Sequence, residues 1–158
     1  MKQLWEVGNF VRGLRSRMRF GNFSRSPLKL LRFELRGEKA ECEWLARQPD
    51  PWDSTLQRLV REQQASLQAL DDAIGMRDML FFSIPDVNVA DLRAYRQSAR
   101  EPPHLIISGT VTREYPADSV KKVPSLVMRA KLYGLKFWMD NGVLVPLESV
   151  ERRLGFAT

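Results

Sequence analysis

Residues 54–82 read STLQRLVREQQASLQALDDAIGMRDMLFF, and apolar side chains recur among them at steps of three and four. This spacing places side chains on one face of a helix, so a long amphipathic helix is predicted. Pro49 and Pro51 precede it, and Ser54 with Gln57 matches a capping box at its start. A helix of this length measures about 42 Å, roughly the width of a small domain. The other elements are therefore expected to pack along it.

The weakest point of this predicted helix is Gly75. Glycine lowers the stability of a helix by about 1 kcal/mol relative to alanine. The polar residues Gln63, Ser66 and Arg77 also interrupt the apolar face. The sequence leaves two alternatives, one continuous helix or a helix that is kinked or broken near Gly75.

The size and composition of the chain fit one folded domain. It has 158 residues, 44% of them hydrophobic, which is enough to form a core. The single cysteine, Cys42, excludes an intramolecular disulfide and a zinc site built from several cysteines. No apolar run is long enough to cross a bilayer, and no signal-peptide pattern opens the sequence. We therefore expect a cytoplasmic protein that is not an integral membrane protein.

Positive charge is concentrated at the beginning of the chain. Residues 1–36 contain nine Lys or Arg and two acidic residues, a net charge of +7. The remaining residues contain sixteen basic and seventeen acidic side chains, a net charge of −1. Such a local field can attract phosphates, anionic lipids or an acidic protein.

The first 18 residues are predicted to form a basic amphipathic helix. Its apolar stripe consists of Leu4, Val7, Val11, Leu14 and Met18. Gly8 and Gly13 weaken the helix, so it is expected to need a docking surface. Either the stripe packs on the rest of the chain with the arginines in solvent, or the segment projects toward a partner. We take residues 1–25 as a basic N-terminal arm and residues 26–158 as the folded domain.

Residues 28–36 and 39–46 are predicted to form a β-hairpin. Apolar residues such as Leu31 and Phe33 alternate with charged residues in both segments, which is typical of strands with one buried and one solvated face. Cys42 falls on the apolar face, where a small buried side chain is expected rather than a reactive thiol. The charged residues are expected to pair across the two strands.

Three shorter helices are also predicted. Asn88 is a suitable cap for a helix over residues 88–97. Residues 125–133 alternate like a strand, but Ser125 as a cap and the Met, Ala, Leu and Lys content favour a helix. A last helix is expected over residues 147–154.

A strand and a hairpin complete the predicted fold. The β-branched run at residues 105–113 predicts a buried strand, with Gly109 as a bulge. The pair Asn141 and Gly142 favours a type I′ turn in a hairpin over residues 135–147. Both faces of this hairpin carry apolar side chains, so each is expected to be covered by the same chain or by a partner.

The fold class that follows is a single α+β domain. We predict a mainly antiparallel sheet of about five strands, packed against one long helix and accompanied by shorter accessory helices.

No set of residues matches a known catalytic pattern. The chain has no Gly-rich phosphate loop, no dinucleotide fingerprint and no nucleophile elbow. His104 is the only histidine. Asp71 and Asp72 are adjacent on the predicted helix, about 100° apart, and are expected on its solvated face. We therefore predict no catalytic residue, cofactor or metal site, with a small enzyme of unfamiliar site as the alternative.

We expect a non-enzymatic binding or interaction protein that uses the basic arm, the apolar surface of the C-terminal hairpin, or both. The hairpin surface would present Trp138 and Leu144 to a protein partner or to a second copy of the chain. The alternative is a nucleic-acid-binding protein, with arginines on phosphates and the phenylalanines beside them on bases. Attachment of the arm to an anionic membrane surface is a further alternative. The arginines concerned are Arg12, Arg15, Arg17, Arg19 and Arg25.

Overall fold

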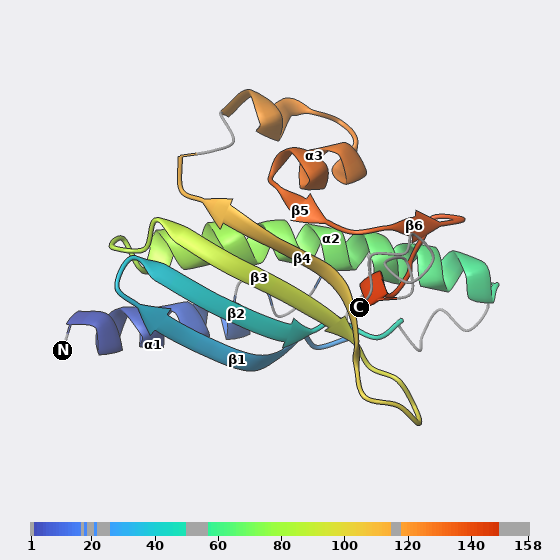
Figure 1. Ribbon diagram of the computed structural model, residues 1–158, viewed down its shortest axis with the longest axis horizontal. Helices are drawn as coiled ribbons and strands as arrows, with labels where there is room; N and C mark the ends of the chain where they lie inside the picture. The colour runs from blue at the N-terminus through green and yellow to red at the C-terminus, as the bar shows by residue number, and fades with distance from the viewer. Residues whose placement is uncertain are drawn as a thin grey trace.

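A five-stranded mixed sheet forms the centre of the molecule, with helices packed on one of its faces (Figure 1). The computed structural model describes residues 2–16, 18, 21, 26–49, 57–114 and 118–148. The strands follow one another across the sheet in chain order. They are β1 (Lys29–Arg36), β2 (Lys39–Leu45), β3 (Val89–Arg96), β4 (His104–Thr112) and β5 (Leu135–Lys136). The predicted α+β fold with about five strands is confirmed.

Three α-helices accompany the sheet in the described part of the chain. They are α1 (Lys2–Ser16), α2 (Arg58–Ser83) and α3 (Leu126–Leu132), and a short 3₁₀ helix covers Asp118–Lys122. A separate two-stranded sheet consists of β6 (Met139–Asp140) and β7 (Val143–Leu144). Among the described residues, no helix has both the length and the apolar character needed to cross a membrane.

The predicted long helix is confirmed as α2, which runs without a break through Gly75. Glycine suits this position because a Cβ there would lie 3.2 Å from Cε of Met18. The predicted start is wrong. Gln57 has an extended backbone, with φ −60° and ψ 149°, and is itself the N-cap, so it cannot serve inside the helix as part of a capping box. Ser54 lies outside the described residues.

The segment predicted as a helix over residues 88–97 is instead strand β3, so that prediction is wrong. Ala90, Leu92 and Ala94 are buried and alternate with less buried residues, which is the period of a strand. β3 pairs in parallel with β2 and antiparallel with β4, so both of its edges are bonded. These pairings override the weak helix-start signal of Asn88.

The predicted hairpin of residues 28–36 and 39–46 is confirmed as β1 and β2, which pair Phe33 with Cys42. One detail differs from the prediction. The register shifts between Leu30 and Arg32, and this irregularity leaves Leu31 exposed instead of on the apolar face. A bulge of this kind moves a side chain off the face that the alternation predicts.

Gly109 was predicted as a bulge in β4, and this is wrong. It pairs in register with Leu92 on one side and Leu135 on the other, and the register shift lies beside Ala94. A Cβ at position 109 would lie 2.6 Å from the backbone oxygen of Gly134. Glycine is therefore required by the close approach of β4 to the chain entering β5.

The C-terminal part agrees with the prediction in its local signals. Ser125 caps α3, because its side chain accepts a hydrogen bond of 3.2 Å from the backbone N–H of Met128. Asn141 and Gly142 have φ values of 56° and 77°, as a type I′ turn requires. The hairpin is shorter than predicted, since β5 joins β4 in the main sheet and only β6 and β7 pair across the turn. From residue 149 onward, the predicted last helix lies outside the described residues.

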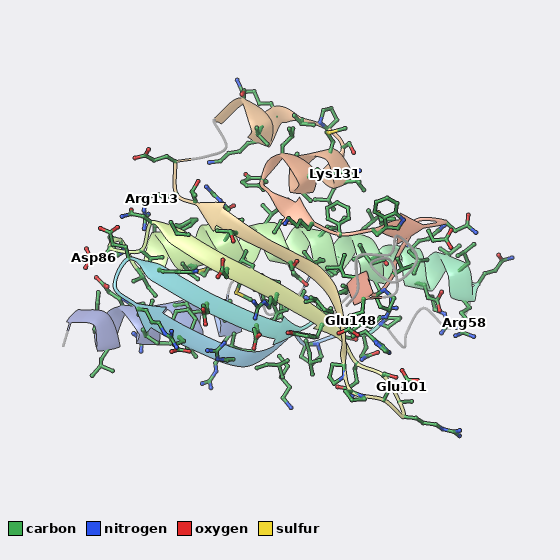
Figure 2. The ribbon with its side chains drawn as sticks, viewed as in Figure 1. Arg58, Asp86, Glu101, Arg113, Lys131 and Glu148 are labelled. Atoms are coloured by element: carbon green, nitrogen blue, oxygen red, sulfur yellow. The ribbon has the colours of Figure 1, made fainter. Side chains whose placement is uncertain are left out.

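The core lies between the sheet and the helices. Its largest fully buried side chains include Phe10, Trp44, Leu70, Met76, Leu92 and Ile107. No described helix crosses the opposite face, where charged side chains cover the strands (Figures 1 and 2). Ion pairs link neighbouring strands there, with Arg32 3.1 Å from Glu41 and Lys39 3.0 Å from Asp91. This face is therefore polar, and many of its charged side chains form ion pairs with one another.

Candidate functional site

Helix α1 docks on its own chain. Phe10 is fully buried, and its ring centroid lies 4.9 Å from that of Phe33 in β1. The helix also packs closely against α2, because a Cβ on Gly13 would lie 2.5 Å from Sδ of Met79. Most of the predicted apolar stripe takes part in this packing, but Leu4 is exposed. Of the two alternatives for this helix, packing of the apolar stripe on the rest of the chain is therefore the one that α1 adopts.

Two exposed aromatic residues lie on the neighbouring helices α1 and α2. Trp5 on α1 is 67% exposed, and Phe82 in the last turn of α2 is 70% exposed. Both line a groove of about 420 Å³ between the two helices. We call it the α1–α2 groove, and its walls include Trp5, Asn9, Arg12, Met79, Phe82 and Pro85.

Helical geometry explains how α1 forms its wall of the groove. Trp5, Asn9 and Arg12 are separated by four and three residues, so they lie on one face of the helix. The guanidinium group of Arg12 donates a hydrogen bond to the side-chain oxygen of Asn9. Arg12 is an exposed residue, so its cationic group is accessible beside the groove.

The other wall is held in place at the end of α2. The guanidinium group of Arg113 donates to the backbone oxygens of Phe81 at 2.7 Å and Ile84 at 3.0 Å. These contacts satisfy carbonyl groups that a helix leaves unpaired at its C-terminus. Arg77 lies over the rings of Phe81 and Tyr133, at 5.1 and 4.9 Å from their centroids. Figure 2 shows Arg113 at this end of the molecule. Phe82 is therefore presented by a fixed turn.

The structure describes two of the five arginines predicted to contact an anion. Arg12 and Arg15 are both exposed on α1. Arg17, Arg19 and Arg25 lie outside the described residues.

The two residues predicted as a partner surface on the C-terminal hairpin do not lie together on the outside. Leu144 is fully buried, and its backbone N–H donates to Oγ of Ser66 at 2.9 Å. Gln63 also donates to the backbone oxygen of Asn141 at 2.7 Å. The hairpin therefore docks on α2 of its own chain. Trp138 is 53% exposed, whereas Leu144 is buried, so the two residues do not form one exposed surface.

A buried ion pair ties the N-terminal segment to the rest of the fold. Nε of Arg47 lies 2.7 Å from Oδ2 of Asp72, and both side chains are almost fully buried. Arg47 also donates to the backbone oxygens of Ser26, at 3.1 Å, and Met18, and Gln68 donates to Asp72 at 2.9 Å. Burial raises the pKa of Asp72, although Arg47 and Gln68 favour its charged form. The prediction that Asp72 lies on a solvated helix face is wrong.

The structure also gives the surroundings of His104 and Cys42, the one histidine and the one cysteine of the chain. Nε2 of His104 is 2.9 Å from Oε2 of Glu101, which Figure 2 shows on the loop beyond the ends of β3 and β4. Burial raises the pKa of the Cys42 thiol to about 12, so it is a poor nucleophile at neutral pH. Within the described ranges, no three His, Cys, Asp or Glu side chains come close enough to hold a metal ion.

The two aromatic residues of the groove were missed by sequence reasoning, although one signal pointed to them. Leu80, Phe81 and Phe82 are consecutive apolar residues, and three consecutive helical residues span about 200° around the axis, so one of them is expected to face away from the core. Trp5 lies one position after Leu4, a residue of the predicted apolar stripe. No protein-family model, curated protein or solved structure matches this chain. Function is therefore inferred from the geometry of the groove.

Proposed function

We propose that this protein is a non-enzymatic interaction module that binds a partner protein in the α1–α2 groove. The observation that supports this is the exposure of Trp5 and Phe82 beside Arg12 in one groove. Single exposed apolar residues are common on protein surfaces, but clustered ones mark binding sites. Trp, Phe and Arg are also enriched where binding energy is concentrated in interfaces.

The chemistry of the groove favours an acidic amphipathic helix as the bound segment. A groove between two helices accepts a third helix, whose apolar side chains contact the aromatic walls. Arg12 and Arg15 are exposed on α1, within the region of net charge +7 formed by residues 1–36. Acidic residues beside the apolar face of the partner would complement this charge and speed association.

A second function, binding of single-stranded nucleic acid, is favoured by the same helix face. Exposed arginines attract phosphates, and an exposed indole ring such as that of Trp5 can stack on an unpaired base. The two functions differ in salt dependence, because phosphate binding weakens steeply as salt rises.

Peptide binding can be measured by fluorescence anisotropy with a labelled amphipathic helical peptide that has leucines on one face and glutamates on the other. Substitutions Trp5→Ser and Phe82→Ser are expected to weaken binding about tenfold or more, because each removes a large apolar contact. Trp138→Ser is the matched control, since Trp138 is exposed but lies outside the walls of the groove. The proposal is contradicted if Trp138→Ser weakens binding as much as Trp5→Ser.

The alternatives are tested with the same variants. A labelled oligothymidine and anionic lipid vesicles replace the peptide, each at low and moderate salt. Oligothymidine binding that is lost at moderate salt, together with no peptide binding, would favour the nucleic-acid function. Vesicle binding without peptide binding would favour a membrane surface as the occupant.

A further inference from the structure

A second cavity lies toward the other end of α2 from the α1–α2 groove. Its volume is about 410 Å³, within the range of roughly 300–1,000 Å³ typical of small-molecule sites. It lies where the carboxyl ends of β2 and β3 face the N-terminal half of α2 (Figure 1). Its walls include Gln48, Arg58, Glu62, Arg96, Ile106 and Val143.

The position of this cavity in the fold is one that favours ligand binding. β2 and β3 are parallel neighbours connected through α2, so the carboxyl ends of both strands lie at the same end of the sheet. In open parallel α/β sheets, ligands usually bind in crevices outside the carboxyl ends of the strands, and β2 and β3 form one such parallel pair in this otherwise antiparallel sheet. Figure 2 shows Arg58 at the N-terminal end of α2, on the side of the molecule where β2 and β3 end.

Among the described residues that line the cavity, the positive and negative charges are not balanced. Arg47 is paired with Asp72 at 2.7 Å, and Arg58 is paired with Glu62 at 3.0 Å. Arg96 also lines the cavity, but among the described residues it contacts no carboxylate. It donates one hydrogen bond of 2.6 Å to a backbone oxygen of β7, and a guanidinium group has several further N–H donors. With respect to the described residues, Arg96 is therefore a cation held in place with N–H donors left for a ligand.

From this arrangement we propose that the cavity binds a small organic anion. Its carboxylate or phosphate contacts Arg96, because the planar guanidinium group matches either group with two parallel hydrogen bonds. The apolar part of the ligand lies against Ile106 and Val143, which form an apolar wall. The bond from Arg96 to β7 holds the cation in place before the ligand arrives, which lowers the entropic penalty of binding.

The test is a titration followed by protein amide NMR spectra with benzoate, phenyl phosphate and the neutral probe benzamide. Both anions are expected to cause saturable shifts at the ends of β3 and β7, at concentrations about tenfold lower than benzamide. The ratio between benzoate and phenyl phosphate shows whether a carboxylate or a phosphate is preferred. Equal affinity for benzamide and benzoate, or no saturable binding of either anion at millimolar concentrations, would overturn the proposal.

Variants assign the binding to this cavity. Arg96→Gln is expected to weaken both anions about tenfold and to leave benzamide unchanged, because it removes the guanidinium group that the anions contact and keeps the apolar residues of the cavity. Arg100→Gln is the matched control, since Arg100 is an exposed residue of the loop between β3 and β4. Ala65→Phe, which fills the cavity from α2, is expected to abolish binding of all three probes and decides the test if Arg96→Gln does not fold. Unchanged anion binding in a folded Arg96→Gln protein, or in Ala65→Phe, would also overturn the proposal.

Discussion

Arg47 and Asp72 show how one buried pair of side chains connects segments that are distant in the sequence. The pair joins the chain after β2 to α2, and Arg47 reaches the backbone of the N-terminal segment at Met18 and Ser26. A buried charge is tolerated only when a partner and hydrogen bonds replace its hydration. Each of the two charges therefore depends on the other.

Replacing one partner of this pair should be strongly destabilising. Arg47→Met is expected to lower the free energy of unfolding by about 3–5 kcal/mol, because Asp72 would remain as an unpaired buried charge. The double variant Arg47→Met with Asp72→Leu is expected to recover part of this loss. Urea denaturation at neutral pH measures both values. A single variant less damaging than the double variant would contradict this account of the pair.

The pH dependence of the Arg47→Met protein provides an internal check. Burial already raises the pKa of Asp72 in the native protein, and removing Arg47 removes a group that opposes this shift. A carboxyl group whose folded-state pKa is raised is least destabilising when it is protonated. The deficit of the variant is therefore expected to shrink as the pH falls through that raised pKa, and to be largest above it.

Local residue signals were predictable, whereas residues defined by distant contacts were not. Ser125 and the Asn141–Gly142 turn were identified correctly, since capping and turn chemistry depend on a few neighbouring residues. Asp72 was misjudged and Trp5 was not singled out, because the sequence pattern does not show which side chain faces another element. The two cavities also depend on packing, so no residue pattern identified them.

At the scale of elements, β3 shows how a strand can be mistaken for a helix. Its alternating buried residues, Ala90, Leu92 and Ala94, are partly small and weakly apolar, so their period of two was not conspicuous. What makes this segment a strand is its pairing with β2 and β4 on both edges. The long amphipathic α2 and the strongly alternating hairpin of β1 and β2 were predicted because their patterns extend over many residues.

The close approach of β4 to β5 leads to a prediction at this scale. Gly109→Ala is expected to lower the free energy of unfolding by about 1–3 kcal/mol, because the new Cβ would overlap the backbone near Gly134 and Leu135. Urea denaturation measures the change. Gly37→Asn is the matched control, since Gly37 has a φ of 60°, which Asn tolerates, and open space around it. Equal stability of Gly109→Ala and the native protein would show that β5 can move away without loss.

For the whole molecule, α1 belongs to the packed structure. The sequence predicted a basic arm over residues 1–25 beside a domain of residues 26–158. Phe10 is nevertheless fully buried against β1, and Met79 of α2 packs on Gly13. Helix α1, which carries Arg12 and Arg15 of this basic region, therefore also completes the core.

Deletion of residues 1–16 tests this description. The deletion is expected to lower the free energy of unfolding by at least the 3–5 kcal/mol or so typical of losing a buried phenylalanine, because it uncovers the core at Phe33 and Met79. Thermal melting and binding of a hydrophobic dye measure the effect. Trp5→Ser, which changes an exposed residue of the same helix, should leave the melting temperature nearly unchanged. If the protein without residues 1–16 had the same melting temperature as the full chain, residues 1–16 would be a separable arm.

The order of the strands also constrains how the chain reaches its native state. β1 meets β2, and β3 meets β4, across short connections. The parallel contact between β2 and β3 forms only when the whole of α2 and its flanking segments are looped back. Closing so long a loop carries an entropic penalty that short turns avoid, and distant contacts slow folding. The kinetic barrier to folding therefore includes closure of this loop, whichever hairpin forms first.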